Sequence, residues 1–169
     1  MAARCRFPGR AGGVAVKLSS IVVFVVTYGA FLLSGLLFRI DLPYYNALIK
    51  PALAPPGYVI GIVWTILFTL ISLAVALLDA KVGIANIGLW LGAALLSNWF
   101  FNQAYSYIQF VRKDWLLAAF DSGILTLTGI VFIALAWKVN RTSAWLFVPY
   151  TLWTAFATYL SAAFWALNR

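Results

Sequence analysis

The sequence has no histidine, one cysteine (Cys5), Met1 as its only methionine, and four carboxylates among 169 residues. Without histidine, no Ser-His or Cys-His catalytic pair can form, and no His/Cys metal cluster can be built. Apart from Cys5 and Met1, tyrosine is the one common axial ligand left for a haem iron. Cys5 has no partner for an intrachain disulfide. We therefore expect no metal site, no required cofactor and no ordinary hydrolytic chemistry.

Charge is also scarce, because 9 % of the residues are charged and 64 % are hydrophobic, and the mean hydropathy is +0.97. Several uncharged runs reach the roughly 20 residues that span hydrocarbon, which excludes a soluble domain and predicts a polytopic helical membrane protein. The net charge is +8. Its Lys and Arg lie between the apolar runs, which favours roles in topology and in lipid-headgroup contact over nucleic-acid binding.

The apolar runs predict one all-α domain, a five-transmembrane-helix bundle over residues 18–169. The expected helices are 18–38, 57–78, 84–108, 115–137 and 144–167. An odd number of spans places the two termini on opposite sides of the membrane. Residues 1–17 are basic and rich in Gly and Ala, which is typical of a disordered tail. We interpret 18–38 as a helix because it is too long for a cleaved signal peptide.

The loop 39–56 ends with three prolines in six residues, Pro51, Pro55 and Pro56. A helix cannot continue through them, because proline removes a backbone donor and biases the preceding residue towards extended geometry. Tyr44 and Tyr45 add aromatic side chains. We predict an ordered loop that acts as a lid over the start of the helix 57–78.

Polar residues recur along one stripe of the helix 84–108 at i, i+4, i+7 and i+11: Asn98, Asn102, Tyr105 and Gln109. The helix 57–78 repeats this spacing with Gly57, Gly61, Trp64 and Phe68. Polar side chains are costly in lipid, so the stripe should face the bundle interior or a cavity. Interhelical hydrogen bonding and a binding pocket are both compatible with it. We favour a pocket for the whole set and hydrogen bonding for Asp121 alone.

Of eight tryptophans, four lie near predicted helix ends, which is typical of an interfacial belt: Trp115, Trp137, Trp145 and Trp165. Trp64, Trp99 and Trp153 lie deeper, where a belt does not account for them. Gly88 and Gly92 form a small-xxx-small pair that lets helices approach closely. The pair fits either packing within one chain or a homodimer interface.

Three stretches resemble one family: KPALAPPGYVIGIVW, NWFFNQAYSY and PYTLWTAFATYLSAAFWALN. The chain is similar over about residues 18–168 to the tryptophan-rich sensory protein/translocator protein (TspO/MBR) family, also called peripheral benzodiazepine receptors. The resemblance implies a five-helix bundle, often a homodimer, that binds porphyrins and, in some members, sterols and synthetic isoquinoline or benzodiazepine ligands. Its pocket residues fall here on Tyr45, Pro55, Trp64, Phe68, Asn98, Asn102, Trp153 and Ala157.

The sequence departs from the family pattern at two positions: Tyr44 stands where members often have tryptophan, and Leu53 stands where an aromatic residue is usual. The family's sterol motif needs a basic residue soon after a tyrosine, whereas Tyr159 lies ten residues before Arg169. We therefore do not expect sterol binding.

Four functions are compatible with these features. The first is a porphyrin-binding sensor or regulator in a bacterial cell membrane, with the macrocycle stacked on aromatic rings and Asn98 and Asn102 donating hydrogen bonds to it. The others are a transporter of porphyrins or other small hydrophobic molecules, a light-dependent porphyrin-degrading enzyme that uses Trp64 or Trp153, and a scaffold. A transporter needs a path through both membrane halves, yet the polar residues gather in one.

The predicted topology places Cys5 and the C-terminal residue on opposite sides of the membrane. A membrane-impermeant thiol reagent applied to sealed vesicles should label Cys5 and an Arg169→Cys variant from different sides. Labelling of both positions from the same side would contradict five spans.

Overall fold

The computed structural model describes residues 17–39 and 41–169, and all secondary structure in these ranges is helical. The predicted all-α fold is confirmed, whereas the predicted tail lies outside the described residues except for Lys17. The α-helices are α1 (Leu18–Leu37), α2 (Leu42–Ala47), α3 (Gly57–Val82), α4 (Leu89–Tyr107), α5 (Trp115–Val139) and α6 (Arg141–Leu167). A 3-10 turn, η1 (Ile84–Asn86), precedes α4, and a π-helical turn, η2 (Ile108–Arg112), follows it.

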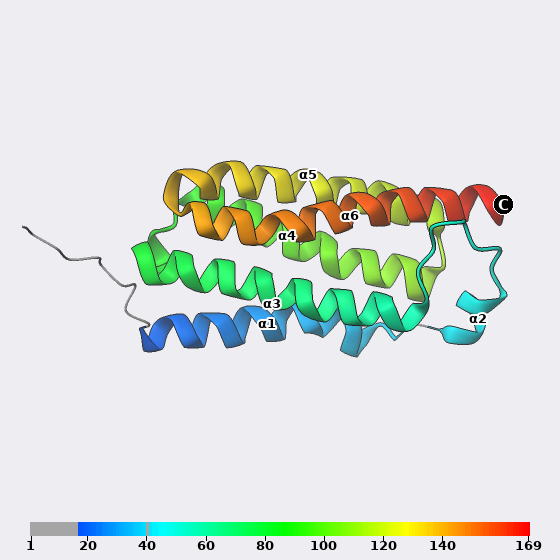
Figure 1. The fold of residues 1–169 in the computed structure, drawn as a ribbon, viewed down its shortest axis with the longest axis horizontal. Coiled ribbons are helices and arrows are strands. Elements are labelled where there is room, and N and C mark those ends of the chain that lie inside the picture. The colour runs from blue at the N-terminus through cyan, green and yellow to red at the C-terminus, as the bar shows by residue number, and fades with distance from the viewer. Residues whose placement is uncertain (1–16, 40) are drawn as a thin grey trace, which may run out of the picture.

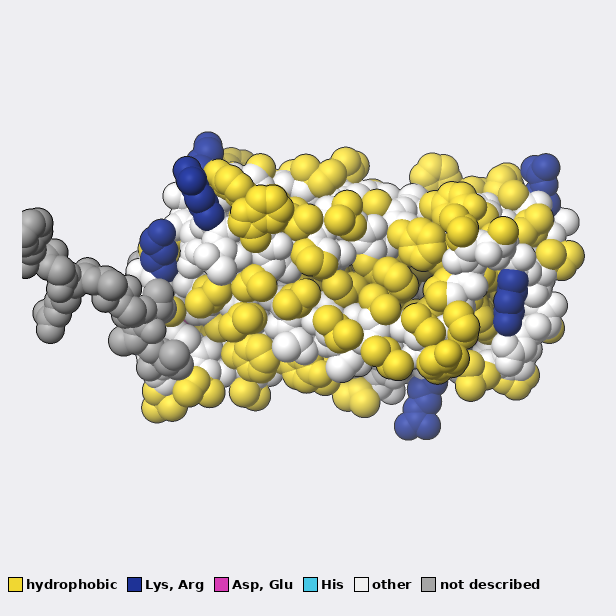
Figure 2. Space-filling model, in the orientation of Figure 1, with side chains coloured by type: hydrophobic (Ala, Val, Ile, Leu, Met, Phe, Trp, Pro, Cys, Tyr) yellow, Lys and Arg dark blue, Asp and Glu magenta, His cyan; other side chains and the backbone are white. Residues whose placement is uncertain are grey.

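The long helices lie side by side in an elongated bundle, with α1 beginning at one end and the chain finishing at the other (Figure 1). Within the described ranges, α1, α3 and α5 are long and apolar enough to cross a membrane. α4 and α6 run beside them but are less apolar, because they bury polar residues such as Asn98 and Thr154 inside the bundle. Hydrophobic side chains cover the visible face along its length, while Lys and Arg gather towards the ends (Figure 2).

A sixth α-helix, α2, corrects the predicted count of five. It lies within the predicted lid loop, at the end of the bundle where α6 finishes (Figure 1). The Asp41 side chain accepts a hydrogen bond from the Tyr44 backbone N–H, and proline stands in the first turn, where its missing donor costs nothing. Six residues are too few for a hydrophobic period to reveal a helix.

α3 continues to Val82, beyond its predicted end at residue 78, although it carries the acidic Asp79. The carboxylate of Asp79 is paired, because the hydroxyls of Ser19 and Ser20 donate to it at 2.9 and 2.8 Å. The N–H of Ile84 donates to its other oxygen at 2.9 Å. These bonds fasten the start of α1 to the end of α3.

The predicted helix 84–108 begins later than expected, at Leu89. Gly83 and Gly88 have φ of +83° and +87°, a left-handed conformation that side chains with a Cβ rarely adopt. The residues between them form η1 instead of an α-helical turn. Gly88 therefore precedes α4 as its N-cap, and only Gly92 lies on the helix.

The core away from the lid is closely packed. Ile71, Leu78 and Phe132 are fully buried there, and the rings of Phe132 and Phe147 stack with centroids 4.1 Å apart. α5 and α6 approach so closely at Gly129 that a Cβ on this residue would lie 2.7 Å from the Thr151 hydroxyl. These contacts leave the lid half of the bundle as the place for a ligand.

Gly92 has little packing of its own within the chain, since a Cβ there would meet only Ile87 at 3.9 Å, and one at Gly88 would meet nothing within 4 Å. Leu89 and Trp90 beside them are more than 70 % exposed. The homodimer interface stays a prediction.

If α4 pairs with a second copy, Gly92→Leu should shift the protein towards the monomer in mild detergent, because the larger side chain blocks close approach. The mass of the protein particle, measured by light scattering, tests this. An unchanged mass would exclude Gly92 from a dimer interface. Gly29→Leu is the matched control, because Gly29 lies on another helix and a Cβ there would meet nothing within 4 Å.

Candidate functional site

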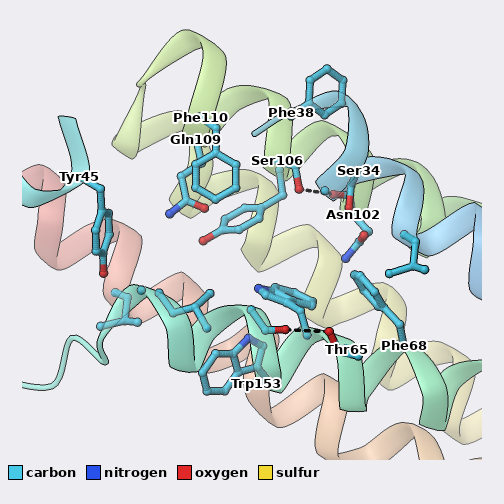
Figure 3. Close-up of a pocket in the computed structure, with 18 of the residues that line it drawn as sticks. Ser34, Phe38, Tyr45, Thr65, Phe68, Asn102, Ser106, Gln109, Phe110 and Trp153 are labelled. Atoms are coloured by element: carbon cyan, nitrogen blue, oxygen red, sulfur yellow. Dashed lines mark hydrogen bonds between the residues drawn. The ribbon is translucent and has the colours of Figure 1, made fainter. Parts of the chain in front are cut away.

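A cavity of about 230 Å³ lies at the lid end of the bundle, between α1, α3, α4 and α6. We define the lid as residues 41–56. Its residue Tyr45 lines the cavity. Figure 3 shows Tyr45, Phe68, Asn102, Gln109 and Trp153 arranged around this space, each from a different element. The cavity therefore depends on contacts between segments far apart in the chain.

One wall of the cavity is aromatic. The ring of Trp64 lies 5.3 Å from that of Phe68, one turn later on α3. It also meets Trp153 of α6 edge to face, with centroids 6.4 Å apart and ring planes at 89°. All three residues line the cavity. Such a wall is suited to stacking a flat conjugated ligand.

The opposite wall carries polar groups on α4 and η2. Asn102 is 2 % exposed, and its Nδ2 donates to the Tyr150 hydroxyl at 3.4 Å while its Oδ1 has no partner among the described residues. The Tyr105 hydroxyl hydrogen-bonds that of Ser161 at 3.2 Å. Gln109 follows on η2 and is also buried. The helical period that predicted this stripe places Asn102, Tyr105 and Gln109 on the cavity.

Three predicted site residues do not line the cavity. Asn98 faces α5, where its Nδ2 donates to the Leu125 carbonyl at 3.1 Å and to the Thr128 hydroxyl at 3.0 Å. Ala157 is buried against Tyr105 and Ala118. Pro55 accepts a hydrogen bond from the Tyr45 hydroxyl through its carbonyl, at 3.5 Å. Asn98 thus donates within the bundle, where a ligand contact was expected.

The expected interhelical hydrogen bond of Asp121 is not found among the described residues. Asp121 is 6 % exposed, and its Oδ2 has no partner there. It does not line the cavity.

The prediction that Trp115 belongs to an interfacial belt is wrong. Trp115 is 6 % exposed, and its ring stacks on Phe164 of α6 with centroids 4.5 Å apart. Its Nε1–H donates to the Tyr44 hydroxyl at 3.0 Å. Trp115 therefore supports the lid from below, whereas Trp137, Trp145 and Trp165 are exposed as a belt requires.

A charged contact holds the start of the lid. Lys113, in the turn before α5, forms an ion pair with Asp41 at 2.8 Å and lies 4.3 Å above the centre of the Tyr44 ring. The hydrogen bond from Lys113 lowers the pKa of the Asp41 carboxyl below its ordinary value, with help from the Tyr44 N–H. Sequence reasoning missed Lys113, because its only signal is a positive charge in a turn.

The cavity also opens sideways, between α1 and α3. Gly35, Gly61 and Thr65 line it and are exposed on the outer surface of the bundle. No heavy atom lies within 4 Å of the place where a Cβ would stand on Gly35 or Gly61. This side of the cavity therefore opens to the outer surface of the bundle.

Comparison with known proteins gives a consistent result. The model of the TspO/MBR family matches residues 21–166. A tryptophan-rich protein TspO of Bacillus cereus is 44 % identical over 153 residues, which cover 90 % of this chain and 99 % of that protein. The uncharacterized membrane protein YtaB of Bacillus subtilis is 41 % identical over 89 % of this chain and 97 % of its own length. The translocator protein of Homo sapiens is 30 % identical, with coverage of 83 % and 84 %.

The hydrogen bonds of Asn98 predict a structural role. Asn98→Ala should lower the free energy of unfolding by about 1 kcal/mol, since single interhelical hydrogen bonds in membranes contribute about 0.6 kcal/mol on average and up to ~1.7. Thermal unfolding in detergent measures the loss. Ser97→Ala, at an exposed neighbour on the same helix, should unfold like the parent protein. Equal stability of all three proteins would contradict the role.

Proposed function

The chain belongs to the TspO/MBR family and is a multi-pass protein of a bacterial membrane, and from this premise we propose that it binds a tetrapyrrole, of the protoporphyrin type, as a sensor or regulator. The ligand lies in the cavity beneath the lid. Flat synthetic ligands of the isoquinoline or benzodiazepine type suit the same wall. The observation that carries the proposal is the aromatic wall formed by Trp64, Phe68 and Trp153.

The polar wall supports the same ligand class, but with Asn102 as an acceptor of a hydrogen bond instead of a donor. The buried Oδ1 of Asn102 has no partner in the part of the chain that the structure describes, so it is suited to accept a hydrogen bond from the ligand. Asn98 Oδ1 also has no partner among the described residues, but Asn98 does not line the cavity and its Nδ2 donates within the bundle.

The size of the cavity indicates how a macrocycle is held. At about 230 Å³ it is smaller than the roughly 300–1,000 Å³ of pockets that enclose most of a drug-sized ligand. A porphyrin therefore needs either the lid to move or part of its edge to remain in the side opening between α1 and α3. Its apolar substituents would then contact lipid.

Binding is favoured over transport by the packing of the bundle. A transporter needs a route through both membrane halves, but the half away from the lid is filled by fully buried residues such as Ile71, Leu78 and Phe132. The cavity has its lining at the lid end.

A second candidate function is light-dependent degradation of the bound porphyrin. The observation that favours it is the contact between Trp64 and Trp153 at the cavity, which places two oxidisable indoles beside any bound ligand. Light absorbed by the porphyrin would generate the reactive species, and one of these tryptophans would react with it.

Porphyrin titration, followed by tryptophan quenching and the shift of the Soret band, tests the proposed function. Trp64→Phe and Trp153→Phe should each weaken binding several-fold, because buried ring stacking contributes about 0.5–1.5 kcal/mol beyond area burial. Trp145→Phe, at a 61 % exposed position, should bind like the parent protein.

Equal effects at all three positions would mean that porphyrin partitions into detergent or onto the outer surface, and the proposed site would be wrong. Under illumination, loss of the Soret band reports degradation. The same two changes should then slow this loss more than they weaken binding, whereas unchanged rates would exclude a role for these tryptophans.

A further inference from the structure

The lid contacts the C-terminal end of α6 at two points, which lie four residues apart on both segments. Tyr45 on the lid rests on Phe164, with ring centroids 5.6 Å apart. Four residues later on both segments, Ile49 meets Asn168, the residue that follows α6. Tyr45 and Phe164 both line the cavity, so this pair of segments forms its cover.

The contact between Ile49 and Asn168 is a two-bond pairing with the backbone. The Ile49 N–H donates to Asn168 Oδ1 at 2.9 Å, and Asn168 Nδ2 donates back to the Ile49 carbonyl at 3.0 Å. This reproduces the paired N–H and C=O exchange of two antiparallel strands. Only a carboxamide supplies a donor and an acceptor side by side in this way.

Asn168 is itself held in place by α6. Its Nδ2 also donates to the Phe164 carbonyl at 2.9 Å, and its backbone N–H donates to the same oxygen at 3.1 Å. Because Nδ2 faces two carbonyls and Oδ1 faces an N–H, the orientation of the amide is fixed. The side chain is therefore set before the lid arrives, which lowers the entropy lost on closing.

We propose that Asn168 is a positioning residue that latches the lid and so sets the rates at which ligand passes into and out of the cavity. It acts through Ile49 and places Tyr45 over the cavity without touching the ligand. Since the latch contacts only residues of the chain itself, its loss should accelerate association and dissociation together. The rate measurement rests on the proposed porphyrin function, whereas the mobility of the lid does not.

The test compares Asn168→Ala with Ile49→Pro. The first removes both hydrogen bonds from the side of α6, and the second removes the N–H donor from the lid while leaving the end of α6 intact. Asn46→Ala is the control, because Asn46 is an exposed lid residue whose side chain accepts a hydrogen bond from Lys50 at 3.2 Å and forms no other among the described residues.

Hydrogen exchange of the ligand-free protein, followed by mass spectrometry, should show faster exchange over residues 46–54 in Asn168→Ala and in Ile49→Pro, but not in Asn46→Ala. Stopped-flow binding of protoporphyrin should show both rate constants raised in the first two variants. Loss of two hydrogen bonds predicts about a tenfold rise for Asn168→Ala, with the equilibrium constant changed less than twofold.

Unchanged lid exchange would overturn the latch even if porphyrin binds normally. Unchanged rate constants with faster lid exchange would also overturn it, because ligand then passes through the side opening between α1 and α3. A rise confined to dissociation, or to Asn168→Ala alone, would mean a distorted cavity or a frayed α6, and the proposal would be wrong. Absence of porphyrin binding in the parent protein would instead contradict the proposed function and leave the exchange result to decide the latch.

Discussion

Hydrocarbon offers no hydrogen-bond partner, and this constraint decides where the polar side chains of this chain lie. Asp79 collects three donors at the end of the bundle, and Asn98 donates twice across α4 and α5. Hydroxyls such as that of Ser122 donate to the carbonyl one turn earlier on their own helix. Asn102 is an exception on the cavity wall, since its buried oxygen has no partner there, and an unpaired acceptor is what a donor on a ligand would stabilise.

The same helix serves both the cavity and its cover. α6 contributes Trp153 to the aromatic wall, Phe164 to the contact with Tyr45, and its final turn to the pairing with Ile49. Trp115 fills the space behind Phe164 and reaches Tyr44. The lid and the cavity therefore both contact α6, and this helix fixes the position of Tyr45 relative to the residues that line the cavity.

The cavity wall could be predicted because helical periodicity and depth place Trp64, Phe68 and Asn102 towards the interior of the lid half. Asn98 shares that stripe, but a helix face is about 100° wide, and this residue turns towards α5 rather than the cavity. The stripe alone does not separate the two asparagines. The prolines of the loop 39–56 predict the lid, and the family resemblance adds the ligand class.

The contacts that hold the lid on the bundle could not be predicted, because they join residues far apart in the sequence. Trp115 meets Tyr44 across 71 residues, and Asn168 meets Ile49 across 119. A tryptophan at a helix end is usually interfacial, and only the docked lid makes this one a buried support. α2 forms because Asp41 caps it and the bundle supports it, not because six residues favour a helix alone.

The side opening at Gly35, Gly61 and Thr65 changes the reference state for affinity. If the proposed ligand enters by this opening from the bilayer, moving it into the protein removes no apolar surface from water. Dispersion, ring stacking and hydrogen bonding, rather than the hydrophobic effect, must then supply its preference for the protein over lipid. The dissociation constant of such a ligand would be a mole fraction in the membrane, and a value expressed per volume of water would rise with the amount of lipid or detergent present.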